Sequence, residues 1–446
     1  MCECLRYPQL FATTWVSFSI TKTMAFTSML ALGVSTIFLA LTLRSWRSRR
    51  TDPKFEDLGA KIEAVRRIVG FGYVPDMGRD LPQRLKLRAL PNERLVSAFG
   101  VNNSLTTSDP DIHRDFMRVA MEVTKRRDNN DSNTGVDSRW VRLYGIAETR
   151  LRHDLQFAAS SKGQPTKTIP LADCAQRLCL TVVLVDNFDM DPADIPTHTA
   201  SIITREINRQ WISSKSEPQL PKSDLLNERL RTLRLRRLAG LSPEEILSRI
   251  MPQYETLWRV VLLTFVTAYH REYRPAAVKD MAEDVPRCLG DRNRERKALR
   301  LAEEGLRLYP SNKRIYRAPS TDSEERQEPL SADLEAIQRD PAIWGTDALE
   351  FRPERFDELT NLQKLAYFPY SIGYHKCPAF GGFGNRMITT LVVAMGRMLS
   401  REAGEVWFGD GELDCDCDGE ARRGFHRPLP TGREDVDQWS FRLRHY

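Results

Sequence analysis

The stretch Tyr367–Gly384, which reads YFPYSIGYHKCPAFGGFG, decides how this chain is interpreted. Its Cys377 stands in a loop rich in Pro and Gly, before the apolar run RMITTLVVAMGRML, which predicts a buried helix. Backbone N–H groups at the start of a helix favour the charged form of a nearby thiol. Cys377 is therefore a candidate for thiolate chemistry, against the alternative of an ordinary buried or unused thiol.

Two segments upstream of this loop carry charged residues that complement one another. Glu304 and Arg307 are three residues apart in RERKALRLAEEGLRLYP, a predicted helix, so they share one helix face. Such a pair is most often solvated and contributes only tenths of a kcal/mol. The segment FRPERF at residues 351–356 adds Arg355, which can bind a carboxylate through two hydrogen bonds.

In this order and with this spacing, the three segments resemble the cytochrome P450 family of haem-thiolate monooxygenases. That family carries ExxR on one helix, then a PERF-like segment, and then a loop written FxxGxRxCxG. Glu304 and Arg307 match the first motif, and Arg355 falls on the PERF arginine. Gly373 and Cys377 occupy the glycine and cysteine positions of the loop.

Three loop positions depart from the family pattern. Tyr370 replaces the phenylalanine, and Ala379 replaces the final glycine. His375 replaces the arginine that usually meets a haem propionate. An imidazole is cationic for only part of the time near neutral pH, so it is a weaker partner for a carboxylate.

The resemblance implies haem b as the cofactor, with Cys377 as the axial ligand of the iron. A thiolate in that position pushes electron density toward the iron and favours O–O cleavage. Backbone N–H groups around the sulfur tune its potential. Glu304, Arg307 and Arg355 would form a structural network that holds the loop, and loss of one buried member would leave a charge without its partner.

Further cofactor contacts follow from the same resemblance. In LRLYPSNKRIYR, after the ExxR helix, Arg314 is chosen over Arg317 as the arginine that reaches a propionate. DPDIHRDFMR resembles the helix on the propionate side, which makes His113, Arg114 and Arg118 candidates there. The Trp-x-x-x-Arg pattern that the family carries in this helix is absent.

The run YETLWRVVLLTFVTAYH predicts a helix through the middle of the protein, because it is apolar on nearly all sides. The family normally places an acid followed by Thr in this helix, beside the oxygen site. Neither Thr264 nor Thr267 follows an acid directly. Thr267 is the candidate for the catalytic threonine, with simple core packing as the alternative.

The N-terminal region predicts a membrane anchor. Residues 24–43 contain no charge and are long enough to cross the hydrocarbon layer as a helix, with a secretory signal or a buried helix as alternatives. Arginines cluster directly after them, which places the following residues in the cytosol. We therefore expect a single-pass protein of the endoplasmic reticulum membrane, in contact with membrane lipid.

Four regions follow from this interpretation. Residues 1–23 are an N-terminal extension, with Met24 as an alternative start that would make it an artefact of the gene model. Residues 24–43 are the transmembrane anchor, and residues 44–54 are a basic, Pro-containing hinge. Residues 55–446 are the haem-binding catalytic domain. We expect this domain to be mainly α with small β-sheets, in a cytochrome P450-like fold.

Composition limits the partners. With 66 basic and 60 acidic residues the net charge of +6 is too small and too scattered for a nucleic-acid-binding protein. No flavin or nicotinamide motif is present, so electrons would come from an NADPH-cytochrome P450 reductase that docks on the basic face near the cysteine loop.

The expected substrate is an apolar small molecule, with a fungal microsomal enzyme of secondary metabolism as the family-level expectation. Two alternatives remain open. The missing acid–Thr pair suggests a haem-thiolate isomerase, dehydratase or peroxide-using enzyme. The other alternative is a catalytically decayed haem-binding relative that is kept for contacts with partners.

Overall fold

The computed structural model describes residues 58–74, 80–126, 138–160, 167–233, 240–271, 285–289, 291, 294–319, 328–409 and 428–444. The chain divides into two compact units, residues 1–58 and 59–446, and the description below concerns the second. The extension, the anchor and the hinge predicted over residues 1–54 lie outside the described residues. Across the ranges that are described, no helix combines the length and the apolar character needed to cross a membrane.

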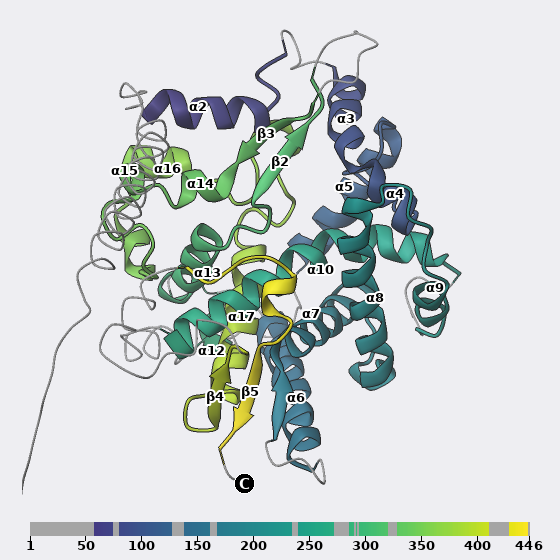
Figure 1. The fold of residues 1–446 in the computed structure, drawn as a ribbon, viewed down its shortest axis with the longest axis vertical. Helices are drawn as coiled ribbons and strands as arrows, with labels where there is room; N and C mark the ends of the chain where they lie inside the picture. Colours follow the sequence, from purple (N-terminus) through teal and green to yellow (C-terminus); the bar gives the residue numbers. More distant parts are fainter. Residues whose placement is uncertain are drawn as a thin grey trace, which may run out of the picture. The chain divides into compact units, whose positions relative to one another are not determined.

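Four helices that pack against one another form the centre of the second unit (Figure 1). They are α6 (Ser138–Ser160), α7 (Leu171–Phe188), α10 (Pro243–Phe265) and α17 (Phe383–Met398). The sequence pattern of α7 allows either a helix or a strand, and the structure has a helix that is buried on almost all sides. The prediction of a mainly helical chain with small sheets is confirmed.

The central helix α10 begins with a well-defined cap. The Ser242 side chain accepts from the N–H of Glu245, the Glu245 carboxylate accepts from the N–H of Ser242, and Pro243 occupies the first turn. Along the rest of the helix, apolar side chains are buried against its neighbours. The helix continues into π-helical turns over η3 (Val266–Arg271).

The other α-helices are arranged around these four. Those that the structure describes are α2 (Leu58–Val69), α3 (Leu81–Ala89), α4 (Glu93–Phe99), α5 (Pro110–Lys125), α8 (Thr197–Ser216), α9 (Asp224–Arg231), α12 (Val285–Cys288), α13 (Arg296–Leu308), α14 (Leu334–Gln338), α15 (Pro341–Trp344) and α16 (Asn361–Ala366). Short 3-10 turns complete the set: η1 (Leu90–Asn92), η2 (Pro192–Asp194), η4 (Pro353–Asp357), η5 (Gly373–His375) and η7 (Glu434–Val436).

Two small antiparallel sheets accompany the helices. One has the strand order β1 (Thr168–Pro170), β5 (Ser440–Leu443), β4 (Gly404–Trp407). The other is formed by β2 (Arg314–Arg317) and β3 (Leu330–Asp333), in a register that pairs Arg314 with Asp333 and Arg317 with Leu330. Side chains alternate between the two faces of a strand, so Arg314 and Arg317 point to opposite faces.

A close approach of two helices positions α13 against α10. A Cβ atom on Gly305 would lie 2.2 Å from Thr264 Oγ1, so a larger residue at this position would push the helices apart. Helix α13 also contacts η4 and α17. Thus α13 joins the central helices to the segments that carry the site.

Candidate functional site

Glu304 and Arg307 form a buried ion pair on α13. Neither side chain is exposed to solvent. Arg307 Nε donates to Glu304 Oε2 at 2.7 Å, and Arg307 Nη2 donates to Glu304 Oε1 at 2.7 Å. This two-point contact is the strongest form of an arginine–carboxylate pair.

The same pair holds distant segments in place. The remaining N–H groups of Arg307 donate to the carbonyl oxygens of Gln338, Ala348 and Glu350. Arg355 Nε donates to Glu304 Oε1 at 3.0 Å. We call Glu304, Arg307 and Arg355 the Glu304 cluster. The structure thus brings together the three residues for which the sequence predicts one network.

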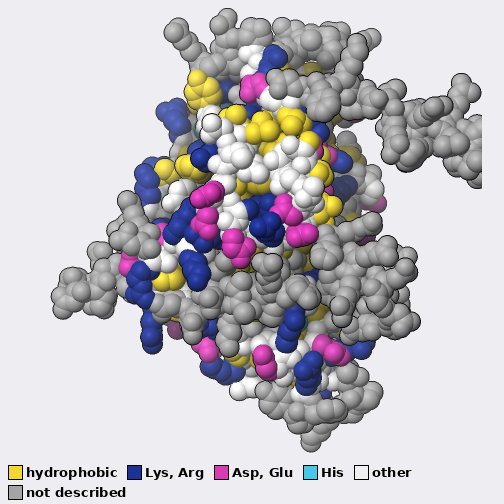
Figure 2. All heavy atoms as spheres, turned by 90° about the vertical axis from the view of Figure 1, so that its left-hand side faces the viewer, with side chains coloured by type: hydrophobic (Ala, Val, Ile, Leu, Met, Phe, Trp, Pro, Cys, Tyr) yellow, Lys and Arg dark blue, Asp and Glu magenta, His cyan; other side chains and the backbone are white. Residues whose placement is uncertain are grey.

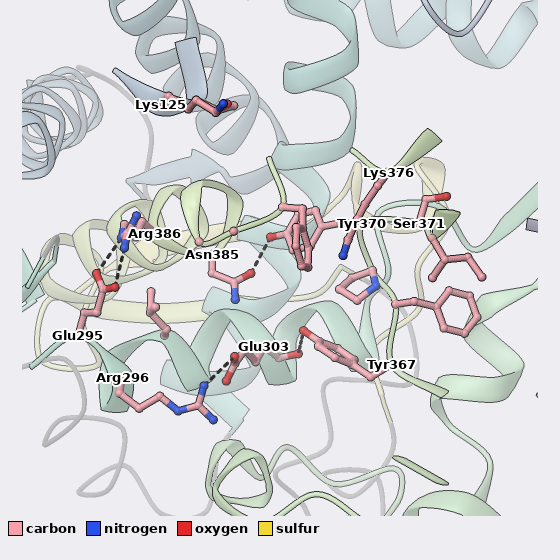
Figure 3. A pocket seen from close by; sticks show the side chains of 18 of the residues that line it. Lys125, Glu295, Arg296, Glu303, Tyr367, Tyr370, Ser371, Lys376, Asn385 and Arg386 are labelled. Atoms are coloured by element: carbon pink, nitrogen blue, oxygen red, sulfur yellow. Dashed lines mark hydrogen bonds and ion pairs between the residues drawn. The ribbon is translucent and has the colours of Figure 1, made fainter. Parts of the chain in front are cut away.

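The cysteine loop is attached to α13 and α17. The hydroxyl of Tyr367 donates to the carbonyl oxygen of Glu303 at 3.1 Å, and that of Tyr370 donates to Asn385 Oδ1 at 2.6 Å (Figure 3). The N–H of Cys377 donates to the carbonyl oxygen of Tyr370 at 2.8 Å. These bonds fix the backbone before the cysteine, and after it the N–H of Phe380 donates to the carbonyl oxygen of Cys377 at 3.0 Å.

Cys377 is exposed to solvent, unlike the buried Cys174, Cys179 and Cys288. Crowding by neighbouring atoms raises the pKa of its thiol, while the backbone N–H of Ala379 and the charge of Arg88 act in the opposite direction. Helix α17 begins at Phe383, six residues after Cys377.

Four buried basic residues meet beside the loop, and we call them the basic cluster. They come from α3, α5, η5 and β2, and each is less than a tenth exposed: Arg88, His113, His375 and Arg317. Arg88 Nη1 lies 3.0 Å from His375 Nδ1. The His113 and His375 rings meet edge to face at 5.5 Å, and Ser104 Oγ lies 2.8 Å from His113 Nδ1.

The basic cluster contains no counter-charge. In the described part of the chain, no carboxylate forms an ion pair with Arg88 or Arg317. Burial lowers the pKa of Arg88 to about 9, assisted by Arg317, and burial lowers the pKa of Arg317 to about 10. Burial, followed by the charge of Arg88, lowers the pKa of His375 to about 2. Uncompensated buried cations are unfavourable, so the cluster suits a ligand that brings its own negative charges.

Three of the sequence-predicted contacts lie away from this cluster. Arg314 is exposed, and its Nε donates to Asp333 Oδ2 at 2.8 Å. Arg118 is exposed and pairs with acidic residues of its own helix, as does Arg114. Strand alternation explains why Arg317, and not Arg314, faces the cluster. No motif pointed to Arg88, which is brought there only by the packing of α3.

Thr267 lies between two helices. Its Oγ1 is 2.6 Å from the hydroxyl of Tyr309, the residue that follows α13, and both side chains are buried. This contact agrees with the packing alternative.

An acid–Thr pair is nevertheless present earlier in α10, as Glu255-Thr256 in the run YETLW, although Thr267 was the predicted residue. Glu255 is buried and forms an ion pair with Arg433. The Thr256 hydroxyl donates to the carbonyl oxygen of Pro252 at 2.9 Å.

A cavity of about 790 Å³ opens beside the cysteine loop (Figure 3). Basic side chains outnumber acidic ones in its wall, among them Lys125, Arg296 and Lys376. Glu303 lies in the same wall, and burial raises the pKa of its carboxyl to about 7. On the face drawn in Figure 2, by contrast, the described basic and acidic side chains intermingle without a continuous basic stripe.

Comparison with known proteins identifies the segment that holds the loop. Residues 300–387 match the family model described as Cytochrome P450. "Cytochrome P450 71A27" of Arabidopsis thaliana is 40% identical over 88 residues, which is 18% of each chain. "Cytochrome P450 72A13" of the same plant is 28% identical over 201 residues, which is 39% of this chain and 38% of that protein. The chain spans less than two fifths of the length of these relatives in the matched region.

Two further similarities complete the comparison. "Bifunctional cytochrome P450/NADPH–P450 reductase" of Aspergillus oryzae is 26% identical over 200 residues, which is 39% of this chain and 18% of that protein. The structure titled "Crystal structure of cytochrome P450DA heme domain" aligns with a TM-score of 0.45 at 14% identity, over 82% of this chain and 85% of the other. The resemblance inferred from the motifs is confirmed by the match over residues 300–387, which contains the Glu304 cluster and Cys377.

Proposed function

We propose that this chain, whose residues 300–387 are a cytochrome P450 segment, is a haem-thiolate monooxygenase. It would insert one oxygen atom into an apolar small molecule, with electrons from NADPH delivered by a separate reductase. The observation that carries the proposal is that buried Arg88 lies 3.0 Å from His375 Nδ1, two residues before Cys377, so the thiol and the buried guanidinium belong to one site. A thiol ligand beside buried cations suits an iron porphyrin with two carboxylates.

The residues present fit haem b in two respects. Cys377 is an exposed residue whose backbone N–H and carbonyl both form hydrogen bonds, to Tyr370 and Phe380. The basic cluster offers cations without carboxylate partners in the described chain, and His375 Nε2 is a buried atom without a hydrogen-bond partner there. In this assignment Cys377 holds the iron, and Arg317 takes the propionate contact that the sequence analysis gave to Arg314.

The bound haem would supply the oxygen chemistry, and the chain's own residues would support it. The N–H of Ala379 stabilises negative charge on the Cys377 sulfur. The Glu304 cluster is structural, because its members contact one another and backbone carbonyls. Glu255 and Thr256 would hold and pass protons in α10, a role that we transfer from Thr267 because an acid directly precedes Thr256 and not Thr267.

The Glu255-Thr256 pair also bears on the alternative functions. An isomerase, dehydratase or peroxide-using enzyme was suggested by the absence of an acid–Thr pair, and that reason no longer holds. Localisation at the endoplasmic reticulum through residues 24–43, the fungal microsomal type and a role in secondary metabolism remain part of the proposal.

An electron-donating partner is supported by two observations. Two of the relatives are named as bifunctional cytochrome P450/NADPH–P450 reductases, one from Bacillus subtilis and one from Aspergillus oryzae. The cavity beside the cysteine loop has a predominantly basic wall, which would attract an acidic protein surface. We propose this side of the protein as the docking site of the reductase.

A difference spectrum of the reduced, carbon-monoxide-treated protein tests the function. We expect the absorbance band typical of thiolate-ligated haem in the wild type and in Cys179→Ala, a control in the buried helix α7. The band should disappear in Cys377→Ala. Survival of the band in Cys377→Ala, or its absence from the wild type after haem reconstitution, would refute the proposal.

A second measurement tests the proton-handling residues. With a reductase and a converted substrate, product formed per NADPH consumed should fall several-fold in Thr256→Ala. It should stay unchanged in Thr267→Val, because that hydroxyl contacts Tyr309. Equal ratios in the wild type and in Thr256→Ala would contradict the assignment.

A further inference from the structure

Arg88 and His375 form a side-chain pair that joins α3 to the cysteine loop. Arg88 is at the end of α3, far from the loop in sequence, and its Nη1 lies 3.0 Å from His375 Nδ1. Both side chains are buried. An arginine can only donate, so Nδ1 of His375 is the acceptor in this bond.

This bond fixes the tautomer of His375. When Nδ1 accepts, the proton of a neutral imidazole resides on Nε2, which is then a donor. His375 Nε2 is buried and has no hydrogen-bond partner in the described part of the chain. A buried donor without an acceptor is unfavourable, so the ring is oriented for an acceptor that the described residues do not supply.

The chain neutralises other buried arginines with its own carboxylates. Arg139 pairs with Asp186, Arg177 with Asp154, and Arg433 with Glu255. Arg88 has no such partner among the described residues, and a second buried cation, Arg317, acts on it electrostatically. The missing acceptor and the missing negative charge therefore occur at the same place.

We propose that Arg88 and His375 together bind one carboxylate of the cofactor, with the guanidinium supplied by α3 and a neutral N–H supplied by the loop. This inference rests on the proposed function and deepens it, because α3 lies outside the matched segment 300–387. Arg88 on α3 would then provide the guanidinium that is missing at position 375, where the loop has a histidine. Binding of the cofactor carboxylate would also lock α3 onto the cysteine loop.

The contribution of the porphyrin carboxylates to binding can be measured by comparing haem with an analogue that lacks their charge. Haem and its dimethyl ester have the same iron and ring, but the ester carries no carboxylate charge. We expect wild-type apoprotein to bind haem at least about tenfold more tightly than the ester, measured by absorbance titration. Arg88→Met, which keeps the volume but removes the charge, should lose most of this discrimination.

A double variant that moves the guanidinium from position 88 to position 375 tests whether the discrimination can be restored. In the double variant Arg88→Met/His375→Arg the guanidinium moves from α3 to the loop, and discrimination between haem and its ester should return. Arg314→Met removes an exposed arginine that pairs with Asp333, and it should leave the discrimination unchanged. Apoprotein carrying Arg88→Met should unfold at an equal or higher urea concentration than wild type, because a buried cation without a partner is gone.

The outcomes separate this inference from the proposed function. If wild type binds neither porphyrin with the thiolate spectrum, the proposed function fails. If wild type shows that spectrum but Arg88→Met discriminates as well as wild type, Arg88 does not bind the carboxylate and this inference is overturned. A double variant without restored discrimination, or a strongly destabilised Arg88→Met apoprotein, would assign Arg88 a purely structural role.

Discussion

The Glu304 cluster and the basic cluster are both buried and charged, yet they differ in balance. In the Glu304 cluster, a single carboxylate accepts from two arginines, and all five N–H donors of Arg307 have acceptors. In the basic cluster, Arg317 donates only to backbone carbonyls, and no described carboxylate reaches it. The charges of the Glu304 cluster are compensated within the protein, whereas those of the basic cluster would be compensated only by a ligand that carries negative charge.

Whether a buried charge has a partner of opposite charge within the protein also distinguishes a structural role from a role in binding. A paired buried charge loses stability when either partner is removed, because the other partner stays behind without compensation. A buried cation without a partner already destabilises the protein alone, so its removal affects binding more than folding. Three predictions test this contrast, beginning with the largest effect.

The largest effect is expected from Arg307→Ala. This variant leaves the Glu304 carboxylate buried and frees the carbonyl oxygens that hold residues 338–350. We expect a loss of about 3–5 kcal/mol in the free energy of unfolding, which is enough to prevent accumulation of folded protein. Urea unfolding followed by circular dichroism measures it. A loss below about 1 kcal/mol would show that the cluster is not the structural centre described here.

Glu303 is expected to give a smaller, pH-dependent effect. It neighbours the Glu304 cluster, and burial raises the pKa of its carboxyl from 4.5 to about 7. The folded state then binds this proton more tightly than the unfolded state, so the stability it contributes is fully present below about pH 4.5 and is lost as the pH rises through about 7.

We therefore expect the stability of wild type relative to Glu303→Gln to fall by about 1–3 kcal/mol over this range. Chemical denaturation at a series of pH values measures the difference. The control is Glu405→Gln, which changes an exposed carboxylate on β4 and should run parallel to wild type. Parallel curves for Glu303→Gln and wild type would mean that Glu303 is ionised throughout.

The smallest effect on free energy is expected from Arg317→Met, compared with Arg314→Met on the same strand. Loss of Arg317 should speed haem transfer to apomyoglobin about tenfold, equivalent to about 1.4 kcal/mol, with little change in apoprotein stability. Loss of Arg314 removes an exposed ion pair, with an effect of about 0–1 kcal/mol on stability and none on haem transfer. Equal transfer rates for the two variants would remove Arg317 from the cofactor site.

Contacts in the site could be predicted from the sequence where the residues lie close together along the chain, and not where they are far apart. Glu304 and Arg307 share a helix turn, so their contact could be inferred from spacing. The choice between Arg314 and Arg317 depended on which face of β2 is buried, and spacing does not specify that. Arg88 carried no motif, because its role arises only from the packing of α3 against the cysteine loop.

The central helix shows a different kind of limit. Thr256 was within reach of sequence reasoning, because the acid precedes it directly in the chain. The apolar run that follows Thr256 in the sequence favoured Thr267 instead. The contact between Thr267 and Tyr309 joins the segment that continues α10 to the residue that follows α13, so it depends on how these two helices pack.

Local order along the chain was sufficient to identify the cysteine loop, the charged helix pair and the predominance of helices, because these depend on neighbours a few residues apart. The packed chain alone decided which charges are neutralised and which are not. The physical reason is that a buried charge such as that of Arg88 is compensated only if groups from remote segments reach within about 3–4 Å of it, and contacts of this kind cannot be inferred from the order of residues.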